Sequence, residues 1–166
     1  MNDFDINDIR MESDFKGMTF SKFKKTEAKK ELLNSLKNGK IEASLNWSSE
    51  FICCGSFIDL WDSILLFVGK HIHLGNPKLP IYLLLRFNNF KEILQNGYVG
   101  FELNMRNNQK IRKLFAEIIS VLCLSKKKHS IENISIKKKE EFDMDTMSSK
   151  LKAPSIDYVG LIFKSE

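Results

Sequence analysis

Residues that break helices or cross-link chains are scarce in this sequence of 166 residues, which has three prolines, eight glycines and three cysteines. Scarce breakers, together with 13 phenylalanines, favour long helices over a sandwich of short strands joined by many turns. A chain of this length buries roughly 68–70% of the surface that its unfolded form exposes, so a core can form without a disulfide or a metal. We therefore expect a globular helical protein.

The cysteines lack the spacing of a disulfide framework or a metal site. Cys53 and Cys54 are adjacent, and Cys123 lies far from both in the sequence. No pair has the C-x-x-C spacing, and an odd number of cysteines cannot pair completely. We expect buried thiols in a reducing compartment.

Segments that target or anchor a protein at a membrane are also missing. The amino terminus is acidic and polar, unlike a secretory signal peptide. The most apolar run, residues 51–69, is interrupted by Asp59 and Asp62 and is too short between them to span a bilayer. We therefore expect an intracellular protein of the cytoplasm or nucleus, neither secreted nor embedded in a membrane.

No residue pattern of a known reaction chemistry is evident. The segment 97–100 has two glycines but lacks the lysine and hydroxyl residue of a phosphate-binding P-loop. On a helix His71 and His73 point about 200° apart and cannot share a metal ion, so we expect polar residues at a helix edge. Cys123 follows apolar helix positions, and no residue that would orient His129 as its base is evident. We expect no enzyme, no metal and no cofactor.

The clearest positive signal is an amphipathic helix from Asn107 to His129. Its apolar residues follow the i, i+3, i+4, i+7, i+11 spacing that places side chains on one helical face. They are Ile111, Leu114, Phe115, Ile118 and Leu122. Asn107 or Asn108 can cap the first turn, and three lysines at the end of the segment sit where the helix dipole favours cations.

Four further helices precede this one in the pattern, at residues 26–38, 41–54, 57–73 and 80–95. The connections between them are short, which favours antiparallel neighbours. We predict an all-α fold, an antiparallel multi-helix bundle. The spacing of the isoleucines after residue 130 leaves open one short strand or extended arm near 131–137, and Pro154 can open a final helix.

The domain organisation follows from composition. Residues 1–17 are acidic with scattered apolar side chains, and we expect a flexible tail, with a short docking segment as the alternative. Residues 18–166 are expected to form a single helical domain. The sequence stops within an apolar pattern that includes Phe163, which indicates either part of a longer protein or an end that docks on a partner.

The net charge of +5 is unevenly distributed. Residues 16–40 carry eight basic and two acidic side chains, and residues 101–139 carry ten and three. The candidate binding residues form three blocks within these segments. The first block is Lys22, Lys24, Lys25, Lys29 and Lys30; the second is Arg106, Lys110, Arg112 and Lys113; the third is Lys126, Lys127 and Lys128.

Three strings of residues resemble an uncharacterised helical family of nucleocytoplasmic large DNA viruses. They are WSSE at 47–50, NPKLPIYL at 76–83 and LCLSKKKH at 122–129. The resemblance covers roughly residues 26–163, carries no known activity or catalytic residue, and adds a viral factory to the expected compartments. The helix order between 41 and 95 is similar to the helical collar of clamp-loader ATPases, but the ATPase module is absent and ATP chemistry is not implied.

Two hypotheses follow. In the first, the protein is a non-enzymatic accessory factor of viral genome replication, transcription or packaging. The three blocks would share one surface and bind nucleic acid, or an acidic protein surface, in a salt-sensitive way without reading bases, since lysine outnumbers arginine and the aromatics are expected to be buried. In the alternative, the protein is a protein-interaction or structural subunit that self-associates or binds a protein partner, and the blocks are unconnected solvated faces.

Overall fold

The computed structural model describes residues 5–128. The chain divides into two compact units, Met1–Ile131 and Glu132–Glu166, and the described residues belong to the first. The strand or arm expected near 131–137 and the final helix expected after Pro154 lie outside the described residues, as does the part of the expected single domain beyond residue 128.

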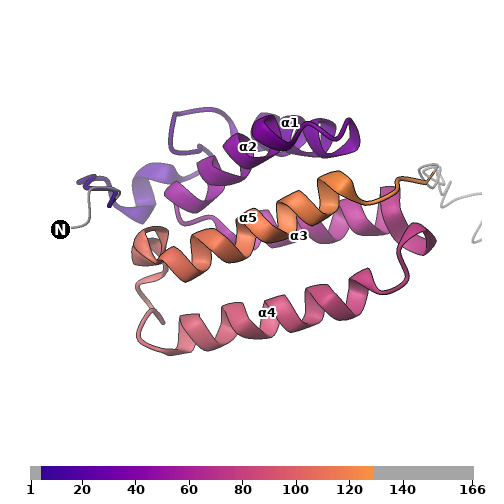
Figure 1. The fold of residues 1–166 in the computed structure, drawn as a ribbon. Coiled ribbons are helices and arrows are strands. Elements are labelled where there is room, and N and C mark those ends of the chain that lie inside the picture. The colour runs from indigo at the N-terminus through magenta and orange to yellow at the C-terminus, as the bar shows by residue number, and fades with distance from the viewer. Residues whose placement is uncertain (1–4, 129–166) are drawn as a thin grey trace, which may run out of the picture. The chain divides into compact units, whose positions relative to one another are not determined.

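The first unit is a bundle of helices that run alternately in opposite directions (Figure 1). The predicted all-α antiparallel bundle is therefore confirmed. Within residues 5–128 the β pairing is limited to an isolated bridge between Met18 and Lys24. The α-helices of the described part of the chain are α1 (Lys25–Lys37), α2 (Ile41–Cys53), α3 (Phe57–Phe67), α4 (Leu79–Gln95) and α5 (Gln109–Leu124).

Residues at the helix ends explain most of these boundaries. Gly39 follows α1 and Gly55 follows α2, and both adopt positive φ angles, +65° and +72°, that a glycine reaches without steric cost. The side chain of Asn108 caps α5 by accepting hydrogen bonds from the backbone N–H groups of Lys110 (2.8 Å) and Ile111 (3.3 Å). The cap proposed from the sequence is thus Asn108, and not Asn107.

The helix predicted over 57–73 is wrong in its second half. After Phe67 the chain first widens into a π-helical turn, η2 (Val68–Ile72), and then tightens into a 3₁₀ turn, η3 (His73–Gly75). The helix predicted to reach His129 likewise ends at Leu124. Both differences lie at the same end of the bundle.

The core is centred on an aromatic cluster shared by three helices. Phe115 of α5 is fully buried, and its ring centroid lies 6.0 Å from Phe57, 5.4 Å from Trp61 and 5.8 Å from Phe90. Each such ring contributes roughly 1.5–3 kcal/mol by leaving water. The predicted apolar stripe of α5 is confirmed, because all five of its members are buried.

The segment before α1 packs against the bundle. Phe15, at the end of the 3₁₀ turn η1 (Glu12–Phe15), is buried. The backbone N–H of Ile6 donates to Asn107 Oδ1 at 2.7 Å, in the 3₁₀ helix η4 (Glu102–Asn107). These contacts hold Ile6 and Phe15 against the bundle. None of the helices within residues 5–128 has the length and apolar character needed to cross a membrane.

Candidate nucleic-acid interface

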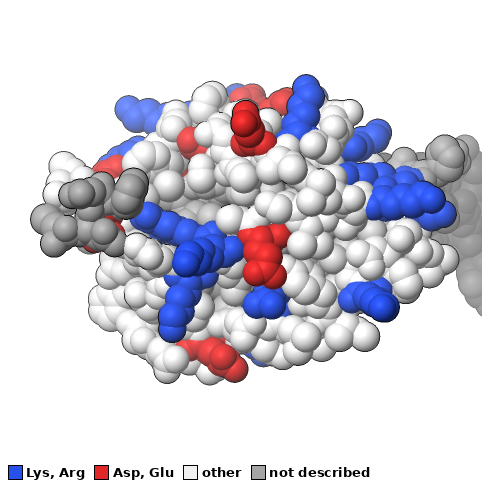
Figure 2. All heavy atoms as spheres, in the orientation of Figure 1, with Lys and Arg blue, Asp and Glu red and all other residues white. Residues whose placement is uncertain are grey.

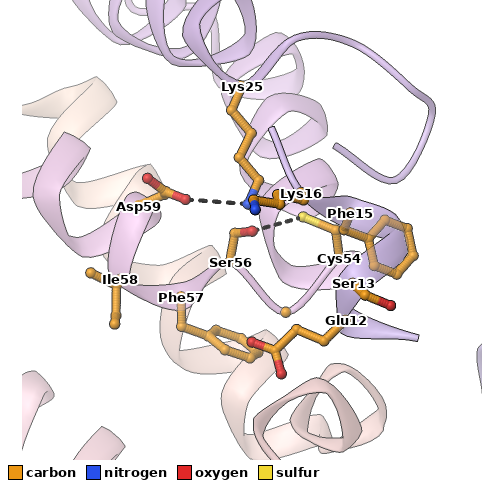
Figure 3. Close-up of a pocket in the computed structure, with 11 residues that line it drawn as sticks. Glu12, Ser13, Phe15, Lys16, Lys25, Cys54, Ser56, Phe57, Ile58 and Asp59 are labelled. Carbon is orange, nitrogen blue, oxygen red and sulfur yellow. Dashed lines mark hydrogen bonds and ion pairs between the residues drawn. The ribbon is translucent and has the colours of Figure 1, made fainter. Parts of the chain in front are cut away.

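The first basic block lies at the start of α1, and part of it is paired with a carboxylate. Lys25 Nζ lies 3.5 Å and Lys29 Nζ 2.6 Å from the two oxygens of Asp59 on α3. Figure 3 shows the Lys25 side chain extended towards Asp59, next to the hydrogen bond between Cys54 and Ser56. Partial burial raises the pKa of Asp59, but the hydrogen bond and charge of Lys29 and the charge of Lys25 outweigh it and hold this pKa below its usual range. Lys22, Lys24 and Lys30 are exposed.

The two arginines of the second block have structural contacts. Arg106 is only 6% exposed and donates to the carbonyl oxygens of Asp8 at 3.0 Å and Cys53 at 3.4 Å. Arg112 Nε donates to the carbonyl oxygen of Arg106 at 2.7 Å, and Arg112 Nη2 donates to Asn107 Oδ1 at 3.0 Å. These guanidinium groups hold the amino-terminal segment, the end of α2 and η4 together. They are not presented to a ligand.

Two lysines of the second block, Lys110 and Lys113, are exposed on α5. They line a surface depression together with Arg86, Glu92 and Glu117, and Arg86 Nε lies 3.3 Å from Glu117 Oε1. Acidic and basic side chains therefore alternate on this face, which weakens its attraction for a polyanion.

The three blocks do not form one surface. Lys110 and Lys126 lie at opposite ends of α5, about 24 Å apart at about 1.5 Å of rise per residue. The first block lies at the start of α1, whereas the third lies beyond the end of α5, where α1 also ends. The expectation that the folded chain joins all three blocks is therefore wrong for this unit, because the first and second blocks lie towards the starts of α1 and α5 and the third lies where both helices end.

The third block is joined instead by lysines that the sequence analysis did not select. α1, α3 and α5 all end at the same end of the bundle, and Figure 2 shows basic side chains gathered there, at the right of the view. We call this set the basic end. Its members are Lys37, Lys40, Lys70, Lys126, Lys127 and Lys128.

Backbone contacts hold the basic end together. The N–H of Lys128 donates to the carbonyl oxygen of His71 at 2.7 Å. A Cβ added to Gly75 would lie 2.8 Å from the carbonyl oxygen of Lys126, so only glycine allows η3 to lie this close to the backbone that follows α5. A Cβ on Gly39 would lie 3.6 Å from the carbonyl oxygen of Cys123. The turns after α1 and α3 therefore both touch the end of α5.

The electrostatics of the basic end show uncompensated positive charge. Burial lowers the pKa of His71, and the charges of Lys37, Lys70 and His73 lower it further. None of the ion pairs within residues 5–128 involves the six lysines. The carboxylate of Glu42, in the first turn of α2, also belongs to this end of the bundle.

Part of this charge has a simpler structural role. Three helices point their carbonyl ends at the basic end, and a cation near a helix carboxyl terminus stabilises the helix by about 0.3–1 kcal/mol. Lys127 Nζ donates to the carbonyl oxygen of Cys123, one of the last carbonyls of α5. Burial lowers the pKa of Lys127. Lys127 therefore acts as a helix cap, and the remaining five lysines are freer to meet a ligand.

The backbone at the basic end is unusual. Lys70 and His71 project from the π-helical turn η2, a type of turn that is frequent at functional sites. His73 adopts φ +30° and ψ −112°, a conformation that L-amino acids rarely take. Such strain persists where the surrounding structure holds it and it clusters at functional sites. The strained backbone at His73 therefore lies at the same end of the bundle as the six lysines.

The cysteines and histidines do not add a chemical site to this description. Cys54 and Cys123 are buried, as predicted, and Cys123 Sγ lies 3.3 Å from Ser44 Oγ. Cys53 is half-buried, and burial together with the charge of Glu50 raises the pKa of its thiol. Among residues 5–128 no group of three or more histidine, cysteine or acidic residues is placed to hold a metal ion.

The basic end is the main structural observation on which a functional proposal can rest, because the comparisons with known proteins add no relative. No protein-family model, no curated protein and no solved structure matches this chain.

Proposed function

We propose that this protein is a non-enzymatic accessory factor that contacts the phosphate backbone of nucleic acid through its basic end. The observation that carries the proposal is the gathering of Lys37, Lys40 and Lys70 with the third block on one end of the bundle, free of the ion pairs that occupy Lys25 and Lys29. Lysines that share a surface act together on a polyanion, whereas scattered lysines do not.

The chemistry of the basic end favours contact without base recognition. Its cations are lysines, which act as point charges towards phosphate, and no arginine is available there for bidentate contact with guanine. The aromatic rings of Phe57, Phe115 and Trp61 are buried in the core and cannot stack on bases. The exposed rings within residues 5–128, those of Phe23, Phe87 and Phe101, lie before α1, within α4 and before η4, away from the basic end. The binding that we propose is therefore electrostatic, non-specific and sensitive to salt. Its assignment to viral replication, transcription or packaging depends on the family resemblance alone.

The test is the salt dependence of nucleic-acid binding, measured by fluorescence anisotropy with a labelled duplex of arbitrary sequence. Each phosphate that a lysine neutralises contributes about −0.9 to the slope of log K against log salt concentration. The triple variant Lys37→Ala, Lys70→Ala, Lys126→Ala should flatten this slope by about 2.7 and weaken binding at low salt. A second labelled strand of RNA tells whether the contact distinguishes the two nucleic acids.

The matched control removes the same number of exposed lysines from the first block, as Lys22→Ala, Lys24→Ala, Lys30→Ala. This variant has the same net charge as the first triple variant, so a general effect of charge would weaken both equally. The proposal requires that the control retains the wild-type slope. Absence of binding at low salt, or equal losses in the two variants, would contradict it.

A further inference from the structure

The outward faces of α3 and α4 expose a group of large apolar side chains. A groove of about 340 Å³ runs between the two helices, with Trp61 and Leu83 at its base. Leu65 and Leu84, which line the groove, are more than half exposed, and so are Leu66, Ile81 and Leu85 elsewhere on the same two helices. A contiguous apolar face of this kind marks an interaction surface more often than it marks a free monomer surface.

The exposed face of α4 carries a regular pattern. Residues spaced alternately by three and four positions form one stripe along the helix, as in the seam of a coiled coil. The stripe is Lys78, Ile81, Leu85, Asn88 and Glu92, and all five side chains are exposed. It lies opposite the buried side of α4, which carries Leu79, Leu83 and Phe90. A cation thus stands at one end of the stripe and a carboxylate at the other, with two apolar residues and Asn88 between them.

We propose that this face binds a second copy of the chain, with the two α4 helices packed antiparallel about a two-fold axis at Leu85. Lys78 and Glu92 are equally far from Leu85 in sequence, so the axis places Lys78 of each copy against Glu92 of the other. Leu85 then meets Leu85, and Ile81 lies opposite the Asn88–Asn89 region. A symmetric dimer needs such a self-complementary surface.

The polar residue in the stripe sets the register. An asparagine at a seam position lowers the stability of a helix pair but disfavours shifted alignments. A parallel arrangement would place Lys78 against Lys78 and Glu92 against Glu92, and like charges at close range repel. Charge and register therefore both select the antiparallel pair.

The size of the face predicts a weak dimer. The stripe lies on α4 alone, which covers about 25 Å by 12 Å, or about 300 Å² on each copy. The total of about 600 Å² lies below the roughly 1,000 Å² of a stable, specific interface. We therefore expect a weak dimer that dissociates on dilution. This inference does not depend on the proposed contact with nucleic acid, which uses the lysines of the basic end and not Lys78.

The experiment is a charge exchange read by sedimentation equilibrium of the full chain. Lys78→Glu or Glu92→Lys alone should weaken dimerisation about tenfold, because each change turns two attractive pairs into repulsive ones. The double variant K78E/E92K should restore it. Leu85→Asp, which brings two carboxylates together on the axis, should abolish it. Lys30→Glu on α1 is the control, since it is exposed but lies on a helix outside the face.

The double variant separates this proposal from a general effect of charge or folding. Circular dichroism establishes that each variant keeps its helices. A monomer at every concentration, or a double variant no stronger than the single ones, would overturn the proposal. A dimer that persists in Leu85→Asp would also overturn it, because it would show that the copies meet elsewhere.

Discussion

Replacement of Arg106 by alanine distinguishes the structural role of this residue from the surface role that its sequence position suggested. The Arg106 guanidinium donates to the carbonyl oxygens of Asp8 and Cys53 and is almost completely buried. A hydrogen bond to a charged group contributes about 1.5–3 kcal/mol. The bond to Asp8, at 3.0 Å, is well formed, whereas that to Cys53, at 3.4 Å, is long and contributes less. The free energy of unfolding should fall by about 2–3 kcal/mol.

Urea denaturation followed by circular dichroism measures this loss. With a slope of about 2 kcal/mol per M, the unfolding midpoint of Arg106→Ala should fall by about 1–1.5 M. Lys110→Ala is the matched control from the same block, since Lys110 is exposed and the expected change lies within about 0.5 kcal/mol. The salt slope of nucleic-acid binding should be unaffected in Arg106→Ala.

The opposite pair of results would refute the reasoning. If Arg106 were a ligand-facing side chain, its removal would leave the urea midpoint unchanged and would flatten the salt slope by about 0.9, like the loss of one phosphate contact. The urea midpoint and the salt slope are measured on the same purified variant, so the results can agree with only one of the two roles of Arg106.

Two further predictions concern pH. Burial and the charges of Lys37 and Lys70 lower the pKa of His71 in the folded protein, so the folded state favours the neutral imidazole. The contribution of this neutral His71 to the free energy of unfolding is therefore lost as pH falls below the ordinary value of 6.5. A phosphate at the basic end should raise this pKa, as NMR titration with and without duplex DNA would detect; an unchanged pKa would argue against binding there. Burial raises the pKa of Asp59, but Lys29 and Lys25 outweigh this effect and lower the pKa in the folded protein. The wild-type protein should therefore be more stable than Asp59→Asn above pH 3.8, and this advantage should be lost as pH falls through the folded pKa. The advantage should stay under about 1 kcal/mol for a partly exposed pair, and urea midpoints as a function of pH would expose a trend of the wrong sign.

The helices and their caps were predictable because their signals are local. Gly39 and Gly55 end helices by adopting positive φ angles, and Asn108 begins one by accepting a hydrogen bond from a backbone N–H two residues later. The apolar stripe of α5 was predictable for the same reason, because its spacing alone specifies which side is buried.

The turn after α3 was not predictable from local pattern. Apolar residues continue through Ile72, so the periodicity indicates a longer helix. The chain bends there because Gly75 packs against the backbone of Lys126, and His71 accepts a hydrogen bond from Lys128. These partners are more than fifty residues away in sequence, and tertiary contacts of this kind override local propensity.

The candidate site was predictable in part. Antiparallel alternation of the five predicted helices already implies that the first, third and fifth end together, so Lys37 and Lys70 could have been grouped with the third block. The burial of Arg106 had no such signal. Its acceptors are the carbonyls of Asp8 and Cys53, and nothing in a sequence distinguishes the carbonyl of one residue from that of another.

The docking of the amino-terminal segment has a consequence for the order in which the protein folds. Ile6 bonds to Asn107 across 101 residues of sequence, and Asp8 bonds to Arg106 across 98. During synthesis the segment emerges before its partners in η4, which leave the ribosome only after four helices have been made. Ile6 and Asp8 therefore reach their final positions only after most of the bundle has been synthesised.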